Sequence, residues 1–200
     1  MPPAALNERR KKQIIEAATI VFTQKGFHRA RMEDIGKAAG LSKGTLYLYF
    51  KDKDALIHAI LDTVFSMEMG DLQAMLMQEG TAVQKLNALL DLYIAESEAV
   101  APALPIMYEF FGMSLRRADV KEVLSEQFNM SIALVEAIIQ MGVEQGDLRP
   151  LNAHKLAITF TMLLDGATLQ LAYGATLSEA NERLRFAVQL LLESILPVNR

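Results

Sequence analysis

The sequence predicts an all-α protein. Apolar residues recur every three to four positions along most of the 200-residue chain, a spacing typical of amphipathic helices. Strict alternation of apolar and polar residues, which marks half-buried strands, is almost absent. Glycine and proline residues stand where the periodic segments end. The expected helices cover residues 7–25, 32–39, 43–50, 53–78, 83–97, 103–117, 120–145, 153–173 and 178–195, with Asn7, Ser42 and Asp52 as N-caps.

The composition is that of a globular protein without thiol chemistry. Hydrophobic residues make up 52% of the chain and charged residues 22%, proportions typical of domains with a buried core. The absence of cysteine excludes disulfides, thiolate metal sites and cysteine nucleophiles. The apolar segment 156–164 is shorter than the roughly 20 residues that span a bilayer, and the N-terminus lacks the apolar stretch of a signal peptide. We therefore expect a cytoplasmic protein with no membrane segment.

Charge is distributed unevenly along the chain. Residues 1–60 hold 11 Lys and Arg against 6 Asp and Glu, whereas residues 61–200 hold 9 against 18. A basic N-terminal part on an acidic body indicates that the N-terminal part meets an anionic partner. Ordinary variation in surface charge explains the same numbers equally well, so charge alone leaves both interpretations open.

Residues 32–46 have the spacing of a helix-turn-helix. This motif needs a small residue where two helices cross, a residue tolerant of positive φ in the turn, and an apolar residue that packs back from the second helix. Gly36, Gly40 and Leu46 occupy these positions. The small core beneath the motif is expected to include Ile35, Ala38, Ala39 and Leu41. The outward face of the second helix is expected to present Lys43, Gly44, Thr45, Tyr47, Leu48 and Tyr49.

A longer pattern surrounds this motif in a fixed order. It consists of Gly26-Phe27, Met32-Glu33-Asp34-Ile35, residues 38–47 (AAGLSKGTLY) and residues 49–56 (YFKDKDAL). These segments resemble the N-terminal signature of the TetR family of bacterial transcriptional regulators and cover about a quarter of the chain. The resemblance implies an N-terminal three-helix helix-turn-helix DNA-binding domain at residues 1–55. A C-terminal helical domain for ligand binding and dimerisation is implied at residues 56–200.

The resemblance also implies roles for single residues. Lys43, Thr45 and Tyr47 are expected to face the major groove or its phosphates, Tyr49 to reach a phosphate, and Lys53 to contact the DNA backbone. Lysine can neutralise phosphate, and Thr and Tyr hydroxyls can donate to its oxygens. For the two tyrosines, packing against neighbouring helices is the alternative.

Arg31 departs from the family pattern, which commonly has Ser or Thr there to cap the first helix of the motif. An arginine cannot provide that cap, but it can hold a phosphate instead. The alternative for Arg31, and for the basic run at residues 9–12, is a solvated surface that raises only non-specific affinity for DNA.

Methionine and phenylalanine are frequent after residue 60. Such side chains can form adaptable walls around an apolar ligand, although core packing is the more common role of any single one. The resemblance implies a pocket for a small hydrophobic or amphipathic effector in this part of the chain, whose chemical identity stays open. The expected pocket residues are Phe65, Met69, Met107, Phe110, Phe111 and Asp165.

The last two expected helices are apolar around more than one face. A two-fold, four-helix seam between two copies would bury the excess, in keeping with a homodimer on a palindromic DNA operator. The alternative is that both helices are internal to one domain. The expected interface residues are Leu164, Leu171, Leu184, Val188, Leu191 and Ile195.

Enzymatic chemistry has little support in the sequence. The three histidines, His28, His58 and His154, are isolated, and no metal-binding pair, nucleophile elbow or phosphate-binding glycine loop is present. We therefore expect no catalytic residues, no metal and no cofactor. The chain is interpreted as a ligand-released repressor that binds double-stranded DNA. A helical binding or scaffolding protein without sequence-specific DNA function is the alternative.

Overall fold

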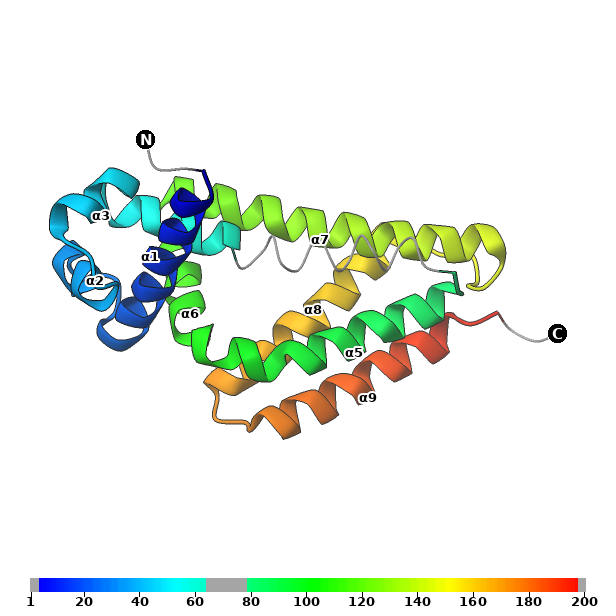
Figure 1. Cartoon of the computed structure of the whole chain (residues 1–200). Helices are drawn as coiled ribbons and strands as arrows, with labels where there is room; N and C mark the ends of the chain where they lie inside the picture. Colours follow the sequence, from blue (N-terminus) through cyan, green and yellow to red (C-terminus); the bar gives the residue numbers. More distant parts are fainter. Residues whose placement is uncertain (1–3, 64–78, 198–200) are drawn as a thin grey trace. The chain divides into compact units, whose positions relative to one another are not determined.

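The computed structural model describes residues 4–63 and 79–197 and confirms the all-α prediction (Figure 1). Within these residues every regular element is helical, and the chain folds into two compact units. The N-terminal unit comprises residues 4–63 with 101–125, and the C-terminal unit comprises residues 79–100 with 126–197. Helix α7 (Ala118–Gln145) contributes to both.

The N-terminal unit contains the predicted helix-turn-helix. Helices α1 and α2 pack together, as do α2 and α3. Residues 53–63 form a further helical segment. The bounds are α1 (Ala4–Lys25), α2 (Met32–Ala38), α3 (Lys43–Tyr49), the short 3-10 helix η1 (Ala101–Ala103) and α6 (Leu104–Ser114).

The turn between α2 and α3 depends on two glycines. Gly40 adopts φ 64°, a conformation that is strained for residues with a Cβ. The Leu41 N–H donates to the Gly36 carbonyl at 2.8 Å, and a Cβ on Gly36 would lie 3.3 Å from the Leu41 carbonyl oxygen. Leu46 is fully buried beneath the turn. The three positions identified in the sequence are thus confirmed.

Other local predictions about this motif have mixed outcomes. Ser42 caps α3, because its Oγ accepts the Thr45 N–H at 3.1 Å, and Asp52 caps the next helical segment by accepting the Ala55 N–H at 2.8 Å. The prediction for Asn7 is wrong, since α1 already begins at Ala4. Ala38 is also exposed and does not join the small core, whereas Ala39 is buried.

Residues far along the chain complete the N-terminal unit. The Glu109 carboxylate on α6 accepts the Phe27 N–H at 2.8 Å. Arg117, just before α7, bonds to Asp54 at 2.5 Å and to Asp119, and its hydrogen bonds hold the pKa of Asp119 well below the usual range. The compact unit is therefore larger than the segment 1–55, and the functional division at residue 55 stays a prediction.

The C-terminal unit surrounds a second core. It contains α5 (Ala82–Val100), the later part of α7, α8 (Ala153–Ala172) and α9 (Leu177–Ile195). Asn152 caps α8, and Thr176 with Glu179 forms a capping box at the start of α9. Gly142 lets α7 approach α5, because a Cβ there would lie only 2.3 Å from the Ala82 Cβ.

Urea unfolding, monitored by circular dichroism, tests the contact at Gly142. Gly142→Ala is expected to lower the free energy of unfolding by about 1–3 kcal/mol, because the added methyl group overpacks the α5–α7 contact. At Gly112, also helical, a Cβ would meet nothing within 4 Å. Gly112→Ala is therefore expected to leave stability unchanged or raise it by up to about 1 kcal/mol. Equal stability of the two variants would contradict the close approach of α5 and α7.

Candidate nucleic-acid interface

Helix α3 presents an outward face that is exposed in the described part of the chain. Leu46 points into the core, whereas Tyr47 is 45% exposed and Leu48 is 83% exposed. Lys43 is exposed as well, and Thr45 is half-buried with its hydroxyl 2.8 Å from Ser42 Oγ. The face therefore combines an ammonium, two hydroxyl groups and an apolar side chain, which is the set needed to contact phosphates and thymine methyl groups.

Lys43 is paired with a neighbouring carboxylate. Its Nζ lies 2.8 Å from Glu33 Oε1, and both side chains are more than half exposed. This hydrogen bond raises the pKa of Lys43 and lowers the pKa of Glu33. Glu33 thus sets a negative charge beside the residue that the sequence assigned to phosphate contact, and the sequence analysis did not identify this pairing.

Arg31 lies at the start of α2 with an exposed side chain that gives no cap. Asp34 accepts the Arg31 backbone N–H at 3.0 Å and pairs with Lys25 at 2.8 Å. The hydrogen bond from Lys25 is the main reason that the pKa of Asp34 is lowered. The start of α2 is therefore held without the guanidinium of Arg31, which lies exposed at the surface.

Tyr49 and Lys53 have roles within the fold. Tyr49 is half-buried and packs against the core of the N-terminal unit. Lys53 Nζ donates to the Phe27 carbonyl at 2.6 Å and lies 4.4 Å from the centre of the Phe27 ring. Of the six expected DNA-binding residues, four therefore lie on helix α3, namely Lys43, Thr45, Tyr47 and Tyr49, while Lys53 is engaged with the turn that follows α1.

The expected pocket residues belong to different parts of the chain, and the pocket stays a prediction. Phe65 and Met69 lie outside the described residues. Met107 and Phe110 are 8% and 0% exposed and belong to the core of the N-terminal unit, while Phe111 is 46% exposed. Asp165 lies on the exposed side of α8, where partial desolvation raises the pKa of its carboxyl. The burial of Met107 and Phe110 agrees with core packing, the alternative given for these side chains.

The expected interface residues need a correction. Leu184, Val188 and Ile195 are at most 3% exposed because they pack in the core of their own C-terminal unit. These three side chains therefore leave almost no surface for a second chain. Leu164, Leu171 and Leu191 are half-buried. The large exposed apolar side chains are instead Met162 and Leu169 on α8, Tyr173 at its C-cap, and Phe186 and Leu190 on α9.

The described residues show no cluster of metal-ligating side chains and no helix long and apolar enough to cross a membrane. Two of the histidines lie beside carboxylates: His154 Nδ1 lies 2.7 Å from Glu136, and His58 Nε2 lies 3.5 Å from Asp119. The arrangement on α3 is that of a helix-turn-helix protein that binds DNA.

Comparison with known proteins makes the assignment specific. Residues 14–60 match the model of the tetR family of bacterial regulatory proteins, and residues 82–197 match that of the C-terminal region of BetI-type transcriptional repressors. The HTH-type transcriptional regulator RutR of Escherichia coli K12 is 32% identical over 150 residues, covering 74% of this chain and 68% of RutR.

Two solved structures share the fold. A transcriptional regulator from Saccharomonospora viridis has a TM-score of 0.81 at 18% identity, covering 96% of this chain and 100% of that one. The regulator FadR from Bacillus subtilis has a TM-score of 0.75 at 19% identity, covering 90% of this chain and 97% of that one. Both likenesses concern the fold alone.

The chain belongs to the tetR family of bacterial regulatory proteins, and its C-terminal region is of the BetI type. It is a DNA-binding transcriptional regulator of the ligand-responsive kind and not an enzyme, which confirms the prediction at the level of the family.

The ion pair between Lys43 and Glu33 predicts how a single substitution changes DNA binding. Glu33→Gln removes a negative charge from the interface and releases Lys43 to pair with a phosphate. Affinity for duplex DNA is expected to rise roughly threefold to tenfold, and the slope of log affinity against log salt to steepen by about 0.9 for each phosphate gained. Fluorescence anisotropy at several salt concentrations measures both quantities.

Glu98→Gln is the matched control, because it removes the same charge from an exposed position on α5, in the other unit. It is expected to leave the salt slope unchanged. Equal effects of the two substitutions would mean that net charge alone, and not the pairing at α3, controls the affinity.

Proposed function

We propose that this regulator is a cytoplasmic repressor that binds a palindromic operator as a homodimer and leaves it when a hydrophobic or amphipathic small molecule binds. The exposed face of α3 is the observation that carries this proposal. Leu48 is 83% exposed although it is a large apolar residue on a short helix that is anchored by Leu46. Such exposure leaves the side chain available for the edge of a base pair.

Each side chain on this face has a distinct expected contact. Lys43 neutralises a phosphate, Thr45 and Tyr47 donate hydroxyl groups to phosphate oxygens, and Leu48 contacts a thymine methyl group. Arg31, exposed at the start of α2, holds a further phosphate. Few of these groups can make bidentate contacts with a base, so part of the specificity comes from DNA shape.

Tyr49 and Lys53 have weaker support as DNA contacts. Tyr49 is half-buried against the core, and the Lys53 ammonium donates to the Phe27 carbonyl. Any contact that these two residues make with phosphates is therefore additional to their role in stabilising the helix-turn-helix. Removing Lys53 would change stability together with DNA affinity, which makes α3 the cleaner place for a test.

Dimerisation through α8 and α9 follows from their exposed side chains. These two helices pack against each other within the C-terminal unit. Phe186 is 66% exposed and Leu190 is 52% exposed on α9, and Tyr173, the C-cap residue of α8, is 78% exposed. A second copy related by a two-fold axis would cover both helices with the same two helices of the partner. The resulting symmetry matches a palindromic operator.

The effector is proposed only as a chemical class. The Saccharomonospora viridis protein was solved in complex with choline, and the Bacillus subtilis FadR protein in complex with stearoyl-CoA. Stearoyl-CoA is amphipathic, and choline carries apolar methyl groups around a charge. A hydrophobic or amphipathic effector for this chain agrees with the frequency of Met and Phe after residue 60.

Selection of bound sequences from a random pool of duplex DNA tests the operator. The full-length protein is expected to enrich a palindrome, and Leu48→Ala to bind that palindrome roughly tenfold more weakly while binding shuffled DNA normally. Leu115→Ala is the matched control, because Leu115 is 86% exposed but lies outside α3. If the wild-type protein enriches no sequence, the scaffolding alternative replaces the repressor.

Sedimentation velocity tests the dimer. Phe186→Glu places a charge in the proposed seam and is expected to convert the dimer to a monomer, with loss of at least about a hundredfold in operator affinity, because desolvating the charge opposes association. Leu115→Glu puts the same charge on an exposed apolar site outside α8 and α9 and should leave the dimer intact. A Phe186→Glu protein that remains dimeric would exclude this seam.

A further inference from the structure

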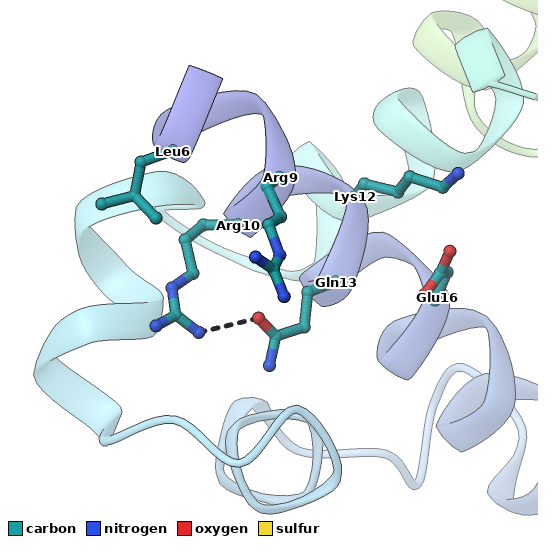
Figure 2. A pocket seen from close by; sticks show the side chains of 6 residues that line it. All are labelled: Leu6, Arg9, Arg10, Lys12, Gln13 and Glu16. Carbon is teal, nitrogen blue, oxygen red and sulfur yellow. Dashed lines mark hydrogen bonds between the residues drawn. The ribbon is translucent and has the colours of Figure 1, made fainter. Parts of the chain in front are cut away.

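The first turns of α1 line a hollow of about 460 Å³ on the N-terminal unit (Figure 2). Three cations and one carboxylate border it, so the hollow carries a net positive charge. An anion is the ligand that such a lining favours. The residues that form it are Leu6, Arg9, Arg10, Lys12, Gln13 and Glu16.

A chain of hydrogen bonds holds one of these cations in place. Arg10 Nη1 donates to Gln13 Oε1 at 2.8 Å, drawn as the dashed line in Figure 2, and Gln13 Nε2 donates to the Ala39 carbonyl at 2.6 Å. Both Arg10 and Gln13 are half-buried. The Arg10 guanidinium uses one of its five N–H donors for the hydrogen bond to Gln13. The orientation of the guanidinium is therefore fixed before a ligand binds. Preorganised donors lose less entropy on binding.

The same hydrogen bonds connect the hollow to the turn before α3, the helix that is proposed to read the DNA. Ala39 immediately precedes Gly40, the turn residue between α2 and α3, and α3 begins at Lys43. Gln13 therefore connects the basic start of α1 to the turn that positions the reading helix, within one compact unit. Leu6, 43% exposed at the edge of the hollow, offers an apolar surface to a deoxyribose.

We propose that this hollow binds one phosphate of the DNA backbone next to the segment that α3 reads. Arg9 and Arg10 donate to the phosphate, and Gln13 is a positioning residue that orients Arg10. This assignment rests on the proposed binding of DNA through α3. DNA is the favoured occupant because α3 brings it to this unit and because residues 1–60 hold nearly twice as many cationic as acidic side chains.

The salt dependence of DNA binding gives the first test. Full-length protein is titrated onto the selected operator at several salt concentrations and followed by fluorescence anisotropy. Arg10→Gln is expected to weaken binding roughly fivefold and to reduce the salt slope by about 0.9 for each half-site. Lys11→Gln is the matched control, since Lys11 does not line the hollow and already pairs with Glu8 at 3.0 Å. An equal change in slope for both variants would overturn the proposal.

A scan of neutralised phosphates locates the contact. Operator duplexes are made with one methylphosphonate at a time, and the loss of affinity is recorded for each position. One position in each half-site should weaken the wild-type protein and Lys11→Gln clearly more than it weakens Arg10→Gln, in which only Arg9 still contacts the phosphate. Gln13→Ala, which keeps every charge, should reduce the sensitivity at that same position. If every position weakens Arg10→Gln as strongly as it weakens the wild-type protein, the hollow does not hold a phosphate.

The outcomes separate this proposal from the proposed function. If the wild-type protein selects no palindrome, the proposed function fails, and the salt slopes of Arg10→Gln and Lys11→Gln on shuffled duplex still decide whether the hollow contacts DNA. If the palindrome is selected but Arg10→Gln behaves as Lys11→Gln does, only the hollow is excluded. Unchanged DNA slopes with altered sedimentation of Arg10→Gln would assign the hollow to the acidic body of a second copy and overturn DNA as its occupant.

Discussion

The peptide groups before and after Phe27 are held by two side chains of opposite charge. The position of α3 depends on these two hydrogen bonds. The Glu109 carboxylate accepts the Phe27 N–H, while the Lys53 ammonium donates to the Phe27 carbonyl. The turn between α1 and α2 is therefore tied to α6 and to the helical segment that begins at Lys53. Charged hydrogen bonds of this kind are stronger than neutral ones, so the turn is a defined support for α2 and α3.

On this supported motif, α3 exposes the side chains of Tyr47 and Leu48. Leu46 anchors the short helix to the core, Tyr49 packs against the same core, and Ser42 caps the start of the helix. The exposed face can then carry Tyr47 and Leu48 at little cost to the fold, because neither is needed for packing. Substitutions at Tyr47 and Leu48 should therefore change DNA affinity without changing the stability of the fold. Lys53, outside α3, differs because this side chain is expected to contact phosphate and also holds the turn at Phe27.

The N-terminal unit also shows how charge and fold interact at a DNA-binding surface. Glu33 and Asp34 lie in the first turn of α2, where negative charge stabilises the helix end. Glu33 pairs with Lys43 and Asp34 with Lys25. Helix stability and DNA affinity therefore place opposite demands on Glu33, since the carboxylate that favours α2 also competes with phosphate for Lys43.

The sequence by itself determined the helices, the turn at Gly40, the caps at Ser42 and Asp52, and the family, because each depends on neighbours a few residues apart. Only the tertiary structure decided which partners distant residues take. Glu109 reaches Phe27 across 82 residues and Gln13 reaches Ala39 across 26. Periodicity likewise marks both faces of α9 as apolar but does not say which face is covered. Val188 is buried and Phe186 exposed, since the contacts that cover a face come from other helices.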